Sequence, residues 1–244
     1  MYNVLIPVDD SPERAVAQAE YVAALPGAAE EVEATVLTVG DDAFAAVDAA
    51  VRAADDLESG GIDVARVVES GSVARAIVDT ASEREADHLV MGGRKRSDTA
   101  TALLGSTVVD VFRSTDLPVT MTGKSMSVRS RDRHLLLPVD DDKERAGHQA
   151  AFVTGLPGDA EDVRVTVLVV FRHQDYKGAP EHTFEEIDAA VLTADRLERA
   201  GVPVDRVAIG GEVPNKILGT AEDNGATEIV MGGRKRSGVQ KVLM

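Results

Sequence analysis

The chain has 244 residues, 44% of them hydrophobic, so it is long enough for two domains that each bury an apolar core. It contains no cysteine, which excludes disulfides, thiolate metal sites and a cysteine nucleophile. Its 42 acidic and 26 basic residues give a net charge of −16, which disfavours nucleic acid as a partner because such a surface repels phosphate groups at long range.

The N-terminal residues and the composition predict a cytoplasmic protein that does not bind or cross a membrane. Residues 1–10 form a short apolar run that ends in acid, without the basic flank and longer apolar core of a signal peptide. No run approaches the roughly 18 apolar residues of a membrane helix. The many acids and few aromatic residues (3%) are typical of a halophilic, high-salt cytosol, and an ordinary acidic protein is the alternative.

Short apolar runs alternate with amphipathic segments through residues 1–122. Strands are expected at 4–8, 32–39, 64–68, 88–91 and 118–121, and helices at 11–25, 44–59, 72–85 and 106–114. This alternation is typical of βα units, whose parallel sheet is buried on both faces. It predicts a Rossmann-like α/β domain in which helices cover both faces of an open parallel five-stranded sheet.

Residues 123–133 are expected to be a linker. The segment contains glycine and serine, lacks apolar periodicity and is rich in basic residues.

Residues 134–244 repeat the first domain. The run from Ile6 to Asp10 returns 131 residues later as Leu137 to Asp141, and the run 91–97 returns unchanged 140 residues later as 231–237. The nine extra residues fall within 171–183, a polar segment with glycine and proline that is expected to be a longer surface loop. A period of this length predicts two whole domains in tandem.

The second repeat stops early. Residues 237–244 correspond to 97–104, so counterparts of the last helix and the fifth strand are missing from the sequence. Either the chain is truncated, or the sequence omits a tail.

A ligand site is expected at the carboxyl ends of the strands, where the winding of an open parallel sheet reverses. Asp9 directly follows the first predicted strand, and its carboxylate can accept hydrogen bonds from a ribose or an adenine. The alternative is that Asp9 or Asp10 caps the helix that starts at Ser11. The sequence leaves both interpretations open.

The segment after the fourth predicted strand has the features of an anion site. It begins at Gly92 and Gly93 and ends at Gly105, Ser106 and Thr107, which open a helix. Glycines let backbone N–H groups approach a ligand, and a helix start offers unpaired donors and a positive dipole. Scattered histidines, by contrast, are expected to be surface or strand-end residues, and no catalytic or metal site is predicted.

This segment resembles that of the universal stress protein family, in which a Gly, two residues, Gly, nine residues and Gly-Ser/Thr follow the fourth strand. Gly92, Lys95 in the second glycine's place, and Gly105 with Ser106 reproduce the spacing. With the opening run that ends at Asp9, the resemblance covers nearly all of both repeats. It implies the strand order 3-2-1-4-5 and a domain like the adenine nucleotide alpha hydrolases.

The resemblance also implies roles for individual residues. In the ATP-binding branch of the family, the first-strand Asp contacts the nucleoside, a Val at the end of the second strand lines the adenine, and the Gly/Ser loop holds the phosphates. The site expected in the first repeat comprises Pro7, Val8, Asp9, Val39, Met91, Gly92, Arg94, Lys95, Gly105, Ser106 and Thr107. A weaker second site comprises Asp140, Val170, Gly232 and Lys235.

Lys95 and Lys235 depart from the family pattern, because a side chain there keeps the backbone away from phosphate. Arg94, Lys95 and Arg96 instead offer charge, unless they pair with surface carboxylates. The sequence thus supports a regulatory module that binds ATP, ADP or AMP, with or without Mg²⁺, and acts on an unknown protein partner. A scaffold that binds no nucleotide and a slow ATPase are the alternatives. The repeats are expected to pair as an internal pseudo-dimer, with a homo-oligomer as a further assembly.

Overall fold

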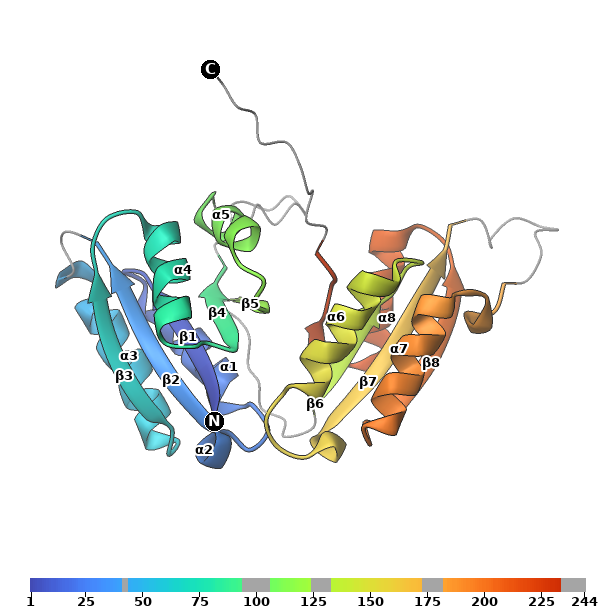
Figure 1. The fold of residues 1–244 in the computed structure, drawn as a ribbon, viewed down its shortest axis with the longest axis horizontal. Coiled ribbons are helices and arrows are strands. Elements are labelled where there is room, and N and C mark those ends of the chain that lie inside the picture. Colours follow the sequence, from blue (N-terminus) through green and yellow to red (C-terminus); the bar gives the residue numbers. More distant parts are fainter. Residues whose placement is uncertain (41–43, 94–105, 124–132, 173–181, 234–244) are drawn as a thin grey trace, which may run out of the picture. The chain divides into compact units, whose positions relative to one another are not determined.

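The computed structural model describes residues 1–40, 44–93, 106–123, 133–172 and 182–233 (Figure 1). The chain divides into two compact units, one of Met1–Ser130 with Leu156–Gly158 and the other of Arg131–Gly155 with Asp159–Met244. Each unit contains one parallel sheet.

The first sheet has the predicted five strands in the order β3-β2-β1-β4-β5, all parallel. Its elements along the chain are β1 (Tyr2–Val8), α1 (Pro12–Ala23), α2 (Ala28–Glu31), β2 (Val32–Val39), α3 (Phe44–Ser59), β3 (Asp63–Glu69), α4 (Val73–Glu83), β4 (His88–Gly92), α5 (Ser106–Ser114) and β5 (Val119–Thr122). The α/β class and the strand order expected from the sequence are therefore confirmed.

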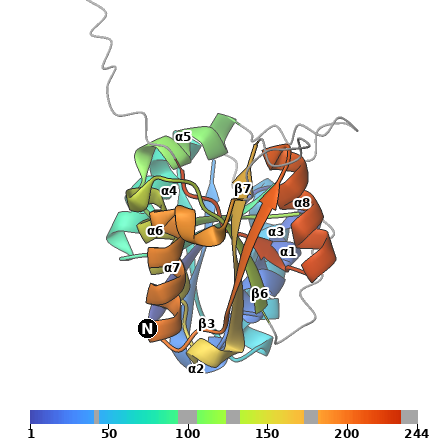
Figure 2. The same ribbon diagram turned by 90° about the vertical axis from the view of Figure 1, so that its right-hand side faces the viewer.

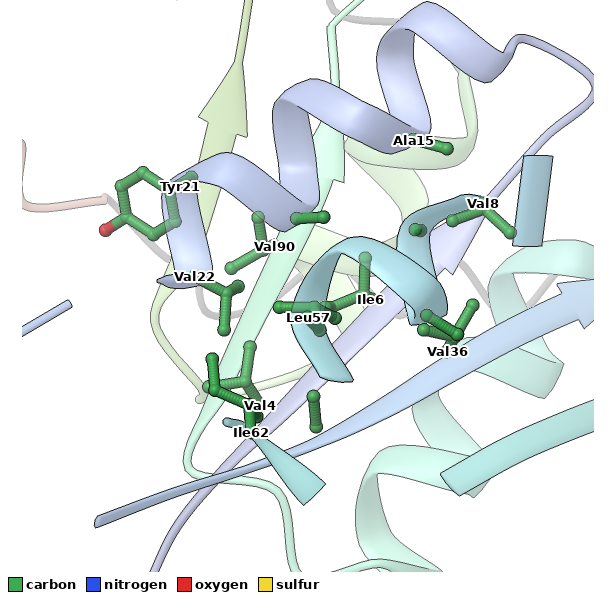
Figure 3. Packing of buried hydrophobic residues seen from close by; sticks show 14 of the residues in the cluster. Val4, Ile6, Val8, Ala15, Tyr21, Val22, Val36, Leu57, Ile62 and Val90 are labelled. Carbon is green, nitrogen blue, oxygen red and sulfur yellow. The ribbon is translucent and has the colours of Figure 1, made fainter. Parts of the chain in front are cut away.

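The apolar strands of this sheet supply two cores, one on each face. Side chains of successive strand residues point to opposite faces. Val4, Ile6 and Val8 accordingly pack in the layer that contains α1 and α3 (Figure 3). Leu5 packs in the other layer with Ile77 of α4 and residues of α5. Burial on both faces explains why β1 reads as a nearly continuous apolar run.

The short helix α2 was not predicted from the sequence. It follows Gly27, which has the left-handed backbone conformation (φ 59°) that glycine adopts without steric cost. Four residues are too few to show helical periodicity, which is why pattern reasoning missed it.

The second sheet has four described parallel strands, in the order β8-β7-β6-β9. Its elements are β6 (Arg133–Pro138), α6 (Lys143–Thr154), η1 (Ala160–Asp162), β7 (Val163–Phe171), η2 (Phe184–Glu186), α7 (Asp188–Arg199), β8 (Val204–Gly210), α8 (Val213–Asn224) and β9 (Glu228–Ile229). Figure 2 shows α6 and α7 on one side of β6 and β7, with α8 on the other. Within the described residues this domain has no counterpart of β5, as the sequence predicted.

Arg133, which the sequence analysis placed at the end of the linker, is the first residue of β6. Its side chain is fully buried, and its Nη2 lies 3.2 Å from Oε1 of Glu228 in β9. The first residue of this strand is thus held by an ion pair inside the domain.

Candidate functional site

Strands β1 and β4 separate toward their carboxyl ends. Their register joins Val4 to His88 and Leu5 to Leu89, whereas the pairing of β1 with β2 continues to Val8. On the β4 side, the Asn3 carbonyl accepts a hydrogen bond from Asp87 at 2.8 Å. Every second residue of a strand faces the same neighbour, so Pro7 also faces β4. Proline has no N–H to donate, so it cannot extend the ladder.

Beyond the end of this ladder, the side chain of Gln18 in α1 connects β1 to β4. Its side chain is almost fully buried, and its Nε2 donates to the carbonyls of Pro7 (2.9 Å) and Val90 (2.8 Å). The glutamine amide thus joins the two strands at the point where the winding of the sheet reverses. In the second domain, Gln149 donates in the same way to Pro138 (3.0 Å) and Val230 (2.7 Å).

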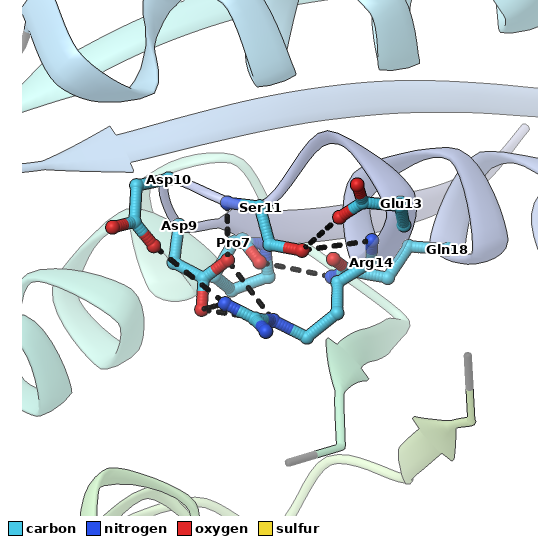
Figure 4. A network of polar contacts seen from close by, with 7 residues as sticks. All are labelled: Pro7, Asp9, Asp10, Ser11, Glu13, Arg14 and Gln18. Carbon is cyan, nitrogen blue, oxygen red and sulfur yellow. Dashed lines mark hydrogen bonds and ion pairs between the residues drawn. The ribbon is translucent and has the colours of Figure 1, made fainter.

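Asp9 lies at the carboxyl edge, directly after β1, and is paired with Arg14 (Figure 4). The Arg14 Nε donates to both carboxylate oxygens at 3.1 Å, and Nη2 donates to Oδ2 at 2.5 Å. The Arg14 side chain is 13% exposed and that of Asp9 is 36% exposed, so solvent reaches the carboxylate. A charged acceptor and a charged donor therefore lie side by side at this edge.

The N-cap of α1 is Ser11 rather than either aspartate. Its side chain accepts from the Arg14 amide at 3.4 Å, while the Asp9 carboxylate accepts from the Ser11 amide at 3.1 Å. Asp9 supports the turn before the helix but does not cap it, so the capping interpretation is wrong for both aspartates. Its carboxylate remains at the open edge of the sheet.

Gly92 lets the end of β4 approach α1. A Cβ at this position would lie 3.2 Å from both Arg14 Cβ and Gln18 Oε1. The next amide, that of Gly93, donates to the Thr122 carbonyl at 2.8 Å and so belongs to the sheet. Glycine at position 92 thus has a packing reason that is independent of any ligand.

The other residues predicted for the first site lie in different layers. Val8 is buried beside α1 and α3, Met91 is buried in the layer of α4 and α5, and Val39 ends β2 and packs against that same layer. Ser106 and Thr107 open α5, which must start near the carboxyl edge because the parallel strand β5 follows it. Arg94, Lys95 and Gly105 lie outside the described residues.

The second domain repeats the arrangement with one more carboxylate. The Arg145 Nη2 pairs with Asp140, and its Nη1 donates to Asp142 at 2.5 Å. A Cβ on Gly232 would lie 2.9 Å from Arg145 Cβ, a closer approach than the 3.2 Å at Gly92. Val170 lies near the end of β7, and Lys235 lies outside the described residues.

Arg14 and Gln18 were missed by the sequence analysis. A polar side chain on a helix is normally assigned to the solvent face. The available signal was the duplication, because Arg145 and Gln149 stand 131 residues further along the chain. Polar residues that are identical in both repeats would have indicated a shared role.

Two of the histidines expected at the surface or at strand ends lie at the starts of β4 and β6, and both are buried. His88 Nε2 lies 2.8 Å from Thr120 Oγ1, and His134 Nε2 lies 2.8 Å from Thr166 Oγ1. In the described part of the chain, no group of three or more His, Asp or Glu side chains is arranged to hold a metal ion. Nor does any described helix combine the length and apolar character needed to span a bilayer.

The fold defines a class of protein: two tandem Rossmann-like α/β domains, each with an open parallel sheet. The model of the universal stress protein family matches residues 1–123 and 133–244, and the chain belongs to this family.

Solved structures agree with this fold. A universal stress protein from Archaeoglobus fulgidus DSM 4304 is similar over 97% of this chain and 86% of its own, with a TM-score of 0.70 and 22% identity. A putative universal stress protein from Pseudomonas aeruginosa UCBPP-PA14 is similar over 98% and 85%, with a TM-score of 0.59 and 18% identity. A universal stress protein in complex with cAMP is 29% identical, covers 50% of this chain and 98% of its own, and has a TM-score of 0.40. No curated protein matches this chain.

Proposed function

We propose that the first domain binds an adenine nucleotide, with ATP as the preferred ligand, at the carboxyl edge between β1 and β4. The observation that carries this proposal is the half-exposed Asp9 carboxylate beside the Arg14 guanidinium, where these strands part. A carboxylate suits the hydroxyl and amino donors of a nucleoside, and a guanidinium suits phosphate. One ligand that carries both groups is a nucleotide.

The remaining roles follow from position and from the family resemblance. Val39, at the end of β2, is proposed to line the adenine. The hydroxyls and backbone amides of Ser106 and Thr107, at the start of α5, are proposed to bind phosphate, which the helix dipole favours. Arg94, Lys95 and Gly105 are proposed for the same task from the sequence alone.

The proposed role is regulatory. A nucleotide that binds one arrangement of the domain better than another shifts the population toward that arrangement. Recognition by a protein partner then changes with nucleotide level. ATP itself is repelled at long range by a chain of net charge −16, so affinity must come from these short-range contacts.

A scaffold that binds no nucleotide is the second candidate, and two contacts favour it. Asp9 is already neutralised by Arg14, and the Gly93 amide is already used by Thr122. Because these groups already have partners within the domain, this edge of the sheet needs no ligand for stability.

Substitution of Ser106 by alanine separates the candidates. If Ser106 binds phosphate, the affinity for ATP should fall by about tenfold, since a hydrogen bond to a charged group is lost. Titration calorimetry of the full chain with ATP and Mg²⁺ measures this change. The matched control is Ser72→Ala, which removes the same hydroxyl from the exposed N-cap of α4, where it makes no capping hydrogen bond.

Wild-type protein that gives neither binding heat nor a thermal shift at millimolar ATP would support the scaffold instead.

A further inference from the structure

We propose that Arg14 is a phosphate-binding residue of the first domain, and that the residue at the helix N-cap decides whether this arginine is open to a phosphate. The N-cap is Ser11 in the first domain and Asp142 in the second. This inference rests on the proposed nucleotide-binding function and assigns a chemical reason for a difference between the two domains.

The Arg14 guanidinium is held in place by Asp9, but only part of its hydrogen-bonding capacity is taken up. Its Nε and Nη2 donate to Asp9, and no acceptor in the described part of the chain takes a hydrogen bond from its Nη1. The aliphatic part of the side chain packs against Gly92 at the end of β4. A fixed guanidinium with an unused edge at the carboxyl end of the sheet is suited to a phosphate, because its N–H groups form a rigid fork.

The equivalent Arg145 has no such edge. Its Nη2 pairs with Asp140 and its Nη1 donates to Asp142, so both ends of the guanidinium are bound by carboxylates. Asp142 also caps α6, since it accepts from the amides of Glu144 (3.1 Å) and Arg145 (3.0 Å). Asp142 thus caps the helix α6 with its carboxylate and also pairs with the Arg145 guanidinium.

Ser11 caps its helix but does not pair with the arginine side chain. Its neutral hydroxyl accepts from the Arg14 amide and donates to Glu13 at 2.8 Å. Among the described residues, the second carboxylate paired with Arg14 is that of Asp10, whose Oδ1 lies 3.6 Å from Nη2 and whose side chain is 74% exposed. Solvent screens a pair that is this exposed, so Asp9 is the principal counter-charge of Arg14.

This difference predicts opposite responses to phosphate. A phosphate at Arg145 would displace a carboxylate or lie between two of them, and like charges at this distance repel. A phosphate at Arg14 finds donors already oriented and one carboxylate on the far side of the guanidinium. An uncharged nucleoside such as adenosine meets no such obstacle in either domain, so it serves as the comparison ligand.

The test titrates ATP and adenosine separately into the full chain, as wild type and as single variants, by calorimetry at physiological salt. Ser11→Asp should lower the ATP affinity by at least about tenfold and leave the adenosine affinity within about twofold, because a charge-assisted contact is lost only for phosphate. Arg14→Gln should show the same selective loss.

The matched control is Ser72→Asp, which adds the same charge at the N-cap of α4, after β3 and away from β4. It should leave both affinities unchanged, since the Debye length at this salt is about 8 Å.

Three results would overturn the inference, and they are distinguishable. If wild-type protein binds neither ligand, the proposed function and this inference both fail. If ATP binds and the binding is weakened by Ser106→Ala but not by Ser11→Asp, the N-cap assignment alone fails. If Ser11→Asp weakens ATP and adenosine equally, with an unchanged circular dichroism spectrum, the residue does not act through phosphate.

Discussion

Replacing Gln18 by alanine is expected to lower the free energy of unfolding of the first domain by about 2 to 4 kcal/mol. The substitution removes the buried amide that donates to Pro7 and Val90 and leaves two carbonyls without that donor. A buried acceptor left without a partner costs about 1 to 3 kcal/mol. Pro7 cannot compensate, because it has no N–H with which to rebuild the ladder to β4.

Tyrosine fluorescence during urea unfolding measures this effect in the first domain when Tyr176, the one tyrosine of the second domain, is replaced by phenylalanine in all variants. The chain has no tryptophan, and Tyr21, which is fully buried on α1, reports on the first domain together with Tyr2. The control is Glu20→Ala, an exposed position on the same helix, which should change the free energy by less than about 0.5 kcal/mol. Equal unfolding midpoints for Gln18→Ala and wild type would show that the bridge does not stabilise the sheet.

Replacing Glu228 by alanine is expected to destabilise the second domain by about 3 to 5 kcal/mol. The Arg133 side chain is fully buried and that of Glu228 is 12% exposed, so the pair is largely removed from water. Loss of the carboxylate leaves the guanidinium with the cost of its burial and without this counter-charge. The effect is larger than for a surface pair, whose loss typically costs no more than about 1 kcal/mol.

Urea unfolding followed by circular dichroism measures this second effect. Glu222→Ala, which truncates an exposed glutamate on α8, is the control. The double substitution Arg133→Met with Glu228→Leu should recover much of the loss, because apolar residues of similar size often replace a buried ion pair without cost. A single substitution that costs under about 1 kcal/mol would indicate that water reaches the guanidinium.

The sheet architecture was predictable because it depends on patterns that recur along the chain. Apolar runs such as 4–8 and 32–39 alternate with amphipathic segments, and the duplication shows the same plan twice. The same alignment of repeats predicted that the second domain has no counterpart of β5, and none lies among its described residues. Local features without a period, such as α2, carried no comparable signal.

The site was only partly predictable. Asp9 could be placed because it directly follows β1, and Gly92 because it directly follows the core of β4. The pairing of Asp9 with Arg14 depends on how α1 lies across the end of the sheet, which spacing along the chain does not determine. Gly92 is an example: the sequence predicted that it lets the backbone approach a phosphate, and the structure shows in addition that it lies in close contact with Arg14.

The position of β4 between β1 and β5 gives the carboxyl edge a mechanical link to the border of the sheet. Gly92 is in register with Thr122 of β5, and the Gly93 amide is bound to the carbonyl of the same threonine. A displacement of the end of β4 therefore moves the outermost strand with it. Occupancy of the proposed site would therefore reach the outermost strand through the hydrogen bonds between β4 and β5, without any intervening helix or loop.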